Sequence, residues 1–474
     1  MNLKRRTFLS TAAVAGVGAA MPSWAATGPL TPEQFGAKGD GVTNDTDAFA
    51  RLAQAIALRG GGEIALRKTT YLVGRQLLGH AARTGYAFEP ATILEFVNLP
   101  GPLTISGNGA RLLCAPGLRY GTFDSRTGAA TKNKMPYTQP GELASPYRAM
   151  IRVENSAGAV EISDLELDGN LKRLKIGGQY GDTGWQIPAT GLLLINNKAS
   201  ERISRIHSHH HAQDGIMIDG VDRSRGSAAA SVIEDVRCEY NGRQGVSLVG
   251  GRGYAFKRCK FNHTGKAGIA TSPGAGVDIE AEAGKKVRDV SFANCEFSNN
   301  FGCGLVADSG DSEGASFTAC TFIGSTNWAA WPNKPRFRFV DCTFVGPIVR
   351  AFGDPNRERA TQFHGCTFRD DPALSPTGTV YGGENTDRPI GDLPGNKNVL
   401  FNKCRFLLTH QAVLPWSVDV TYADCTLSQK APKHGFPRGV YLGRNTITGA
   451  VAIGGSLVQG SLTVNGQHYG SGRI

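Results

Sequence analysis

A repeated Cys-x-aromatic motif constrains the fold of this 474-residue chain more than any other feature. The motif, or a close variant, starts at Cys238, Cys259, Cys295, Cys320, Cys342, Cys366, Cys404 and Cys425. Successive copies are 21, 36, 25, 22, 24, 38 and 21 residues apart, and no helical periodicity lies between them. Repeats of this length are typical of solenoids, in which every turn contributes short strands to shared sheets. We therefore predict an all-β solenoid of short strands.

The cysteines themselves are expected to be packed rather than bridged. The chain has 10 cysteines, and the repeat places one at the same inward position of each turn. Stacked turns bring such residues to about 4.8 Å, but parallel side chains do not readily reach the disulfide torsion near about 90°. We predict a column of reduced thiols that act as small buried hydrophobic groups.

On this repeat the chain resembles the right-handed parallel β-helix (pectin lyase-like) superfamily, which includes pectate lyases and polygalacturonases. The resemblance implies a right-handed parallel β-helix solenoid with a short N-terminal capping helix. Ala48, Phe49, Leu52, Ala53 and Ile56 recur at helical spacing, so residues 48–58 are expected to form that helix, capped by Asn44 or Thr46. We expect the cap and first strands within 27–90, the β-helix with its surface loops within 91–430, and C-terminal strands within 431–474.

The first 26 residues have the pattern of a twin-arginine export signal. Arg5 and Arg6 precede an Ala/Val/Gly-rich run and a small-x-small site near Ser23 and Ala25. Removing this segment with its three basic residues would lower the formal charge from +11 to about +8. We therefore expect a periplasmic or secreted protein that does not insert into a membrane after the signal is removed.

A set of acidic residues appears when the turns are aligned on a recurring glycine, at Gly215, Gly245, Gly276 and Gly304. Side chains alternate along a strand, so the first and third residues after each glycine point inward and the second and fourth point outward. The outward carboxylates are Asp219, Asp278, Glu280 and Asp308. Strands about 4.8 Å apart, with same-face residues about 6.6 Å apart, place these groups close together.

Crowded carboxylates repel one another, so one of them is expected to keep its proton near neutral pH. A carboxylic acid beside an ionised carboxylate is what hydrolysis of a glycosidic bond needs. We expect Asp278, Glu280 and Asp308 to be catalytic, with Glu280 as the acid and Asp278 or Asp308 as the base. A solvated acidic surface without chemistry is the alternative.

Residues at the border of this acidic group are candidate substrate contacts: Asp214, Asp219, His211, Arg243 and Lys266. Alternating His207, His209 and His211 could share one face and bind a transition metal, but no zinc motif of standard spacing accompanies them, so we expect no metal site. The polygalacturonase motifs are not reproduced either. Gln213-Asp-Gly only partly matches Asn-Thr-Asp, and residues 242–245 lack the histidine of Gly-His-Gly.

The sequence favours an exported, polysaccharide-active enzyme, most simply a glycoside hydrolase acting on a possibly acidic glycan without a cofactor. A polysaccharide lyase or uronate epimerase would instead use Ca²⁺ and a basic residue. A non-catalytic carbohydrate-binding solenoid is the third alternative. No nucleic-acid-binding module is recognisable, and the positive charge is spread along the chain. The expected partner is a polysaccharide or oligosaccharide, and the sequence leaves the oligomeric state open.

Overall fold

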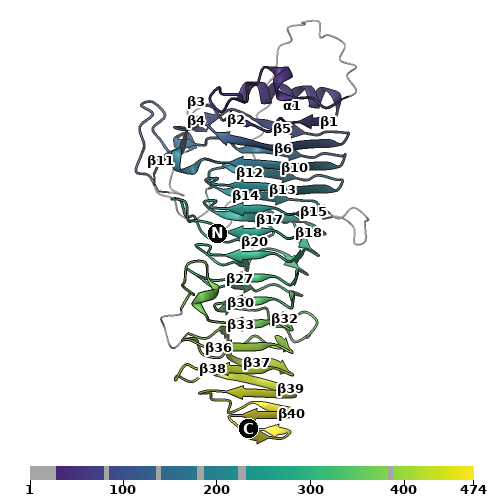
Figure 1. The fold of residues 1–474 in the computed structure, drawn as a ribbon, viewed down its shortest axis with the longest axis vertical. Coiled ribbons are helices and arrows are strands. Elements are labelled where there is room, and N and C mark those ends of the chain that lie inside the picture. Colours follow the sequence, from purple (N-terminus) through teal and green to yellow (C-terminus); the bar gives the residue numbers. More distant parts are fainter. Residues whose placement is uncertain (1–27, 80–84, 135–139, 179–185, 223–230, 383–387) are drawn as a thin grey trace.

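The computed structural model describes residues 28–79, 85–134, 140–178, 186–222, 231–382 and 388–474. The expected export signal at 1–26 lies outside the described residues and stays a prediction. The described chain winds into one long solenoid of parallel strands, with α1 (Thr46–Arg59) at its N-terminal end (Figure 1). None of the described helices is long and apolar enough to span a bilayer.

Each coil contributes strands to three parallel stacks. The first stack contains β5 (Leu94–Val97), β9 (Ala149–Glu154), β12 (Thr190–Ile195), β14 (Asp214–Asp219), β17 (Gln244–Arg252), β20 (Val277–Ile279), β24 (Leu305–Ala307), β28 (Ala330–Pro332), β31 (Ile348–Val349), β34 (Gly391–Leu393) and the start of β37 (Trp416–Ala423). We call its outward side the site face, because the acidic residues predicted from the sequence lie on it.

Along the chain, the strands of the second stack precede those of the first stack in each coil. It contains β2 (Thr70–Val73), parts of β6 (Leu103–Cys114), β10 (Val160–Asp168) and β13 (Glu201–His209), then β16 (Arg237–Glu239), β19 (Lys260–Asn262), β23 (Glu296–Ser298), β27 (Thr321–Ile323), β30 (Thr343–Val345), β33 (Thr367–Arg369), β36 (Arg405–Leu408) and β38 (Thr426–Gln429).

The third stack contains β1 (Gly62–Ala65), the first halves of β6, β10 and β13, then β15 (Ser231–Glu234), β18 (Tyr254–Lys257), β22 (Ser291–Ala293), β26 (Ser316–Thr318), β29 (Arg338–Val340), β32 (Gln362–His364), β35 (Leu400–Asn402), the end of β37, β39 (Pro437–Thr448) and β40 (Leu457–Val464). At the C-terminal end, β41 (Gln467–Tyr469) and β42 (Gly472–Arg473) pair antiparallel with β40.

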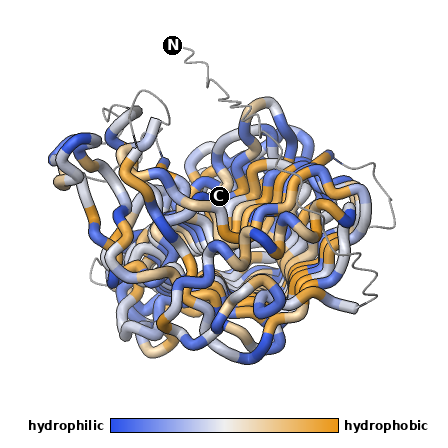
Figure 2. The backbone as a smooth tube through the Cα atoms, turned by 90° about the horizontal axis from the view of Figure 1, so that it is seen from above, coloured by the Kyte–Doolittle hydropathy of each residue, from blue (hydrophilic) through white to orange (hydrophobic). Residues whose placement is uncertain are grey.

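The core is built from side chains that repeat at one position in successive coils. Seen along the axis, hydrophobic segments overlie one another from coil to coil (Figure 2). In the third stack the rings of Phe292 and Phe317 lie parallel at 4.9 Å between centroids, and those of Phe317 and Phe339 at 4.7 Å. Phenylalanine columns of this kind fill the interior with large apolar surface and favourable ring contacts. The predicted all-β parallel solenoid is confirmed.

The predicted cysteine column is also confirmed. All ten cysteines are buried and unbridged. Eight of the thiols lie against backbone carbonyls. Cys320 Sγ, for example, is 3.5 Å from Phe292 O and 3.4 Å from Thr318 O. The column is therefore a packed part of the core that also satisfies weak S–H donors.

We expect thiol titration of denatured, unreduced protein to detect nearly all ten cysteines, because none is bridged in the fold. The same titration after reduction provides the reference value. A large increase on reduction would contradict the packed, reduced column.

The capping helix is confirmed, with one correction at its start. Phe49, Leu52 and Ile56 are buried against the first coil, where they cover its open end. The N-cap is Asp45, not Asn44 or Thr46. The Asp45 carboxylate accepts hydrogen bonds from the backbone of residues 38 and 39, so it also holds the preceding loop on the helix.

Residues within 115–145 and 171–188 contribute strands to a second, five-stranded sheet. It comprises β3 (Gln76–Leu78), β4 (Tyr86–Pro90), β7 (Arg119–Thr122), β8 (Leu143–Ala144) and β11 (Lys175–Gly177), and projects beside the N-terminal half of the solenoid (Figure 1). Tyr120 Oη donates to Ile187 O at 3.1 Å, which ties this sheet to the coil that leads into β12.

Candidate functional site

The alignment of coils on their glycines, made from the sequence, matches the observed register. Val246 of β17 pairs with Val277 of β20, and Val277 pairs with Leu305 of β24. These three side chains are buried, and the outward position between them holds Ser247, Asp278 and Val306 in successive strands. Asp278 therefore lies on the site face as expected, but its surroundings differ from those of a solvated carboxylate.

Asp278 is only 3% exposed. Gln244 Nε2 donates to Asp278 Oδ2 at 2.9 Å, and Gln244 Oε1 accepts from Ala275 N at 3.0 Å, which fixes the amide orientation. Burial raises the pKa of Asp278 well above its usual range, and the nearby charge of Glu280 raises it further. Asp278 thus keeps its proton to a higher pH than an ordinary aspartate.

Glu280 and Asp308 lie on the more accessible side of the same group. Glu280 is half-buried and accepts a hydrogen bond from Ser309 Oγ at 2.7 Å, whereas Asp308 is exposed. Their charges both act on Asp278. The expected grouping of three carboxyls is therefore present. We expected Glu280 to be the proton donor, whereas it is the pKa of Asp278 that the structure raises.

A second buried carboxyl lies beside this group. Asp214 is fully buried; its Oδ2 accepts from Ser247 Oγ at 2.9 Å and lies 3.5 Å from Arg243 Nη1. Burial raises the pKa of Asp214, while Arg243 and Ser247 act in the opposite direction. Burial lowers the pKa of Arg243, but the charges of Asp214 and Asp278 raise it, and the net shift is upward. Arg243 is therefore a buried cation that pairs with Asp214 and whose charge also acts on Asp278.

Three residues that we expected to contact a substrate instead contact other residues of the protein. His211 is fully buried, with Nδ1 2.8 Å from Tyr147 Oη and Nε2 3.1 Å from Leu167 O, and burial lowers its pKa to about 3. Asp219 forms an ion pair with Lys285, next to a bulge that displaces it from the register of β17. Lys266 Nζ donates to Thr326 Oγ1 at 2.6 Å.

These positions correct two expectations. His211 cannot contact a substrate in this conformation, because the chain turns it into the interior after β13; it therefore does not share an outward face with His207 and His209. Asp214 has no exposed surface and Arg243 is ion-paired with it, so we expect both to support the electrostatics of the site rather than to contact a substrate. Gln244 and Ser247 were missed, because a neutral side chain before or within a strand carries no signal of its own.

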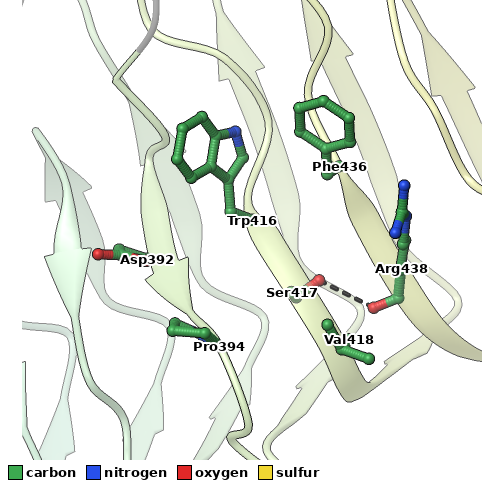
Figure 3. A pocket seen from close by; sticks show the side chains of 7 residues that line it. All are labelled: Asp392, Pro394, Trp416, Ser417, Val418, Phe436 and Arg438. Carbon is green, nitrogen blue, oxygen red and sulfur yellow. Dashed lines mark hydrogen bonds between the residues drawn. The ribbon is translucent and has the colours of Figure 1, made fainter.

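The same outward position continues along the site face to a pocket near the C-terminal end. Val306 pairs with Trp331 of β28, and Asp392 of β34 pairs with Trp416 of β37. Trp416 belongs to a pocket of about 350 Å³. Its lining consists of Asp392, Pro394, Trp416, Ser417, Val418, Phe436 and Arg438 (Figure 3).

The chemistry of this pocket combines a flat aromatic surface with polar ends. Trp416 is 41% exposed, and its ring lies edge to face with that of Phe436 at 6.0 Å. Asp392 and Arg438 add a carboxylate and a guanidinium, and the Arg438 backbone carbonyl accepts from Ser417 Oγ at 2.9 Å (Figure 3). An exposed tryptophan with nearby hydrogen-bonding groups suits a ligand that has one apolar face and polar edges.

Comparison with known proteins identifies the fold. Residues 150–344 match the family described as right handed beta helix region. Depolymerase 1, capsule KN3-specific, of Klebsiella phage KN3-1 is 43% identical over 67 residues, which cover 14% of this chain and 8% of that protein. The chain therefore matches only a small part of that relative.

Among solved structures, the N-terminal fragment of bacteriophage Phi29 gene product 12 is similar with a TM-score of 0.52 and 15% identity, over 94% of this chain and 73% of that chain. The A-module of mannuronan C-5 epimerase AlgE4 from Azotobacter vinelandii has a TM-score of 0.43 and 14% identity, over 94% of this chain and 99% of the module. The match of residues 150–344 confirms the right-handed β-helix, and the Phi29 fragment has a similar fold.

Proposed function

We propose that this right-handed parallel β-helix protein is an exported enzyme that degrades a polysaccharide by hydrolysing its glycosidic bonds. The observation that carries the proposal is the buried, proton-retaining Asp278 beside the more accessible carboxylates of Glu280 and Asp308. Glycoside hydrolysis uses such a pair, because one group must give a proton while the other must be ionised.

In this mechanism Asp278 is the general acid. It donates its proton to the glycosidic oxygen as the bond to the leaving sugar breaks, so the leaving group departs as a neutral alcohol. Gln244 holds Oδ2 through its amide N–H, which leaves the other oxygen to carry the proton. Glu280 or Asp308 then acts as the ionised partner, either by activating water or by attacking the sugar.

The comparisons support a polysaccharide substrate without identifying it. The phage relative is named as a capsule-specific depolymerase, and its 43% sequence identity extends over 67 residues. The aromatic pocket on the same face adds a surface suited to sugar rings. We therefore favour a long glycan that lies along the site face.

A lyase or epimerase is the second candidate, and the site favours it less. That chemistry needs a base at the sugar ring and a Ca²⁺ ion that is held by ionised carboxylates. Arg243 is a poor base because the neighbouring carboxyls raise its pKa, and the raised pKa of Asp278 disfavours the ionised form that Ca²⁺ binds. A binding protein without catalysis remains the third candidate.

The test is incubation of the mature protein, from residue 27, with a panel of neutral and acidic polysaccharides that includes bacterial capsules. Hydrolysis predicts new reducing ends without the ultraviolet absorbance of an unsaturated uronate. Appearance of that absorbance would replace hydrolysis by elimination, and a change in uronate composition without cleavage would indicate epimerisation. Binding without any product would leave the carbohydrate-binding role.

Trp416→Ala should weaken binding of long substrates. The register places Trp416 five strands from Asp278, about 24 Å along the axis at about 4.8 Å per strand. Loss of one aromatic contact of about 1.4 kcal/mol would raise KM about tenfold for the polymer and leave kcat unchanged. Short oligosaccharides that do not reach the pocket should show no change.

Leu58→Ala is the matched control, because Leu58 is an exposed apolar residue on the capping helix, away from the site face. Steady-state kinetics on the polymer and on its short fragments distinguish the outcomes. Equal KM values for Trp416→Ala and wild type on the polymer would remove the pocket from the proposed substrate path.

A further inference from the structure

A compact group of histidines and carboxylates lies on the second stack, across the turn at 210–213 from the site face. The pairing of β10 with β13 places Glu166 opposite His207 and Asp168 opposite His209. The four side chains therefore form a two-by-two grid on the outer side of β10 and β13. Figure 1 shows these two strands stacked next to each other. None of these four side chains takes part in the mechanism proposed above.

The contacts within the grid are close. His209 Nε2 lies 3.1 Å from Glu166 Oε1, and the rings of His207 and His209 have centroids 4.1 Å apart. One ligand atom each from Glu166, His207 and His209 lies within 4.8 Å of the other two. From this geometry we propose that Glu166, His207 and His209 bind a divalent transition metal ion of the Zn²⁺ class.

The hydrogen-bonding pattern of His209 suits a metal ligand. Its Nδ1 lies 2.7 Å from Nδ1 of His210, so one of these nitrogens carries a hydrogen and the other accepts it. Without a bound metal ion, His209 Nε2–H donates to the Glu166 carboxylate. A bound metal ion would replace this proton, and His209 Nδ1 would then donate to His210. Metal-bound histidines usually donate their second ring N–H to a neighbouring acceptor in this way, which fixes the tautomer and the ring orientation.

Glu166 is a better third ligand than Asp168. Asp168 Oδ1 accepts from Asn170 N at 2.7 Å and its Oδ2 accepts from Arg111, so both oxygens are already in use. Glu166 meets both Arg111 Nε and His209 Nε2 through Oε1, each at 3.1 Å, and no contact of Oε2 is found among the described residues. The second oxygen of Glu166 is therefore available to a cation.

His207 completes the set. Its Nε2 is buried without a well-oriented hydrogen bond, although Glu239 Oε2 lies 3.2 Å away, and its Nδ1 lies 3.1 Å from the guanidinium of Arg237. Arg237 is exposed and can move away from the ring. Glu239 is then placed to accept the second N–H of a metal-bound imidazole.

The ligand chemistry selects the class of metal. Two imidazoles and one carboxylate suit Zn²⁺ and its neighbours, whereas Ca²⁺ and Mg²⁺ prefer sets made of oxygen alone. Three protein ligands leave one coordination position for water. Since the ligands come from two adjacent coils, the ion would join β10 to β13 and stabilise the stacking of the solenoid.

The test uses full-length mature protein without a histidine tag, stripped of metal by a chelator and titrated with ZnCl₂ by calorimetry. We expect one equivalent to bind, the melting temperature to rise on binding, and Co²⁺ to give a visible ligand-field spectrum. His207→Ala and Glu166→Gln should each weaken Zn²⁺ binding by at least about tenfold. His468→Ala, at an exposed histidine on β41, should bind as wild type does.

Circular dichroism of each variant establishes that it is folded before binding is compared. The proposal is overturned if wild type binds no Zn²⁺, or if folded His207→Ala and Glu166→Gln both bind it as tightly as wild type. It is equally overturned if His468→Ala loses as much affinity as they do, because binding would then be spread over surface histidines. These readouts do not depend on enzymatic activity, so failure of the hydrolase proposal would leave this one standing.

Discussion

Replacing Asp278 by asparagine should lower kcat on the identified polysaccharide by about 10²-fold or more, the usual contribution of a general acid. The amide keeps the shape of the side chain but has no proton to transfer. Gln244 can still donate to the remaining carbonyl oxygen, so the local structure should survive. KM should change little, because the lost interaction belongs to the transition state.

Asp419→Asn provides the matched control, since Asp419 is an exposed aspartate on β37. It should retain wild-type kinetics. Glu280→Gln and Asp308→Asn then separate the partner roles, because the residue that acts as base or nucleophile should also lose activity. Wild-type rates in Asp278→Asn would exclude Asp278 as the acid and reduce the site face to an acidic surface.

The pH dependence follows from the direction of the Asp278 shift. Burial and the charge of Glu280 raise the pKa of Asp278 in the folded protein, so the acid is active below that pKa and is lost as pH rises through it. kcat of wild type should therefore fall on the alkaline side. Because the folded state binds this proton more tightly than the unfolded state, Asp278 makes folding less favourable as pH rises above about 3.9.

The same linkage predicts the stability of the variant. Asp278→Asn removes a carboxyl that is costly to ionise in a buried position, so its free energy of unfolding at neutral pH should equal or exceed that of wild type. Urea unfolding at neutral pH measures this directly. A clear loss of stability in Asp278→Asn would mean that the carboxyl supports the fold. A lower kcat of this variant could then not be assigned to the missing proton alone.

The fold could be predicted from the sequence because its signal repeats. Cys320 and Phe322 occupy the same two interior positions as their counterparts in other coils, so each coil provides independent evidence for one structure. The glycine alignment worked for the same reason, and placed Asp278 on the correct face. Periodicity therefore gives the fold and the direction of side chains.

Burial on the outer face could not be predicted in this way. Alternation predicts that Asp278 points outward, but the side chain is only 3% exposed and accepts a hydrogen bond from Gln244, and no periodicity predicts this burial. His211 shows the opposite error, because the chain leaves the strand at residue 210 and the alternation ends there. The choice between Glu280 and Asp278 as the acid therefore depends on burial, which the repeat does not encode.

The aromatic columns give the largest expected effect on stability. Phe317→Ala should lower the free energy of unfolding by about 3–5 kcal/mol, the usual range for removal of a buried phenylalanine. Phe317 is fully buried on β26 and is stacked between Phe292 and Phe339, with an edge contact to Phe322 at 5.7 Å. Coils above and below hold the backbone, so the space cannot close fully and a cavity remains.

Phe301→Ala is the control, because Phe301 is 41% exposed in a turn and removing it should cost much less. Urea unfolding followed by circular dichroism and by fluorescence measures both variants. Each coil of a solenoid is stabilised mainly by its neighbours, so the probes can report separate transitions in Phe317→Ala if the column is interrupted. Activity below the unfolding transition should remain near that of wild type, since Phe317 lies in the third stack, away from the site face. Equal losses of stability in Phe317→Ala and Phe301→Ala would show that the stacked column is not what holds the coils together.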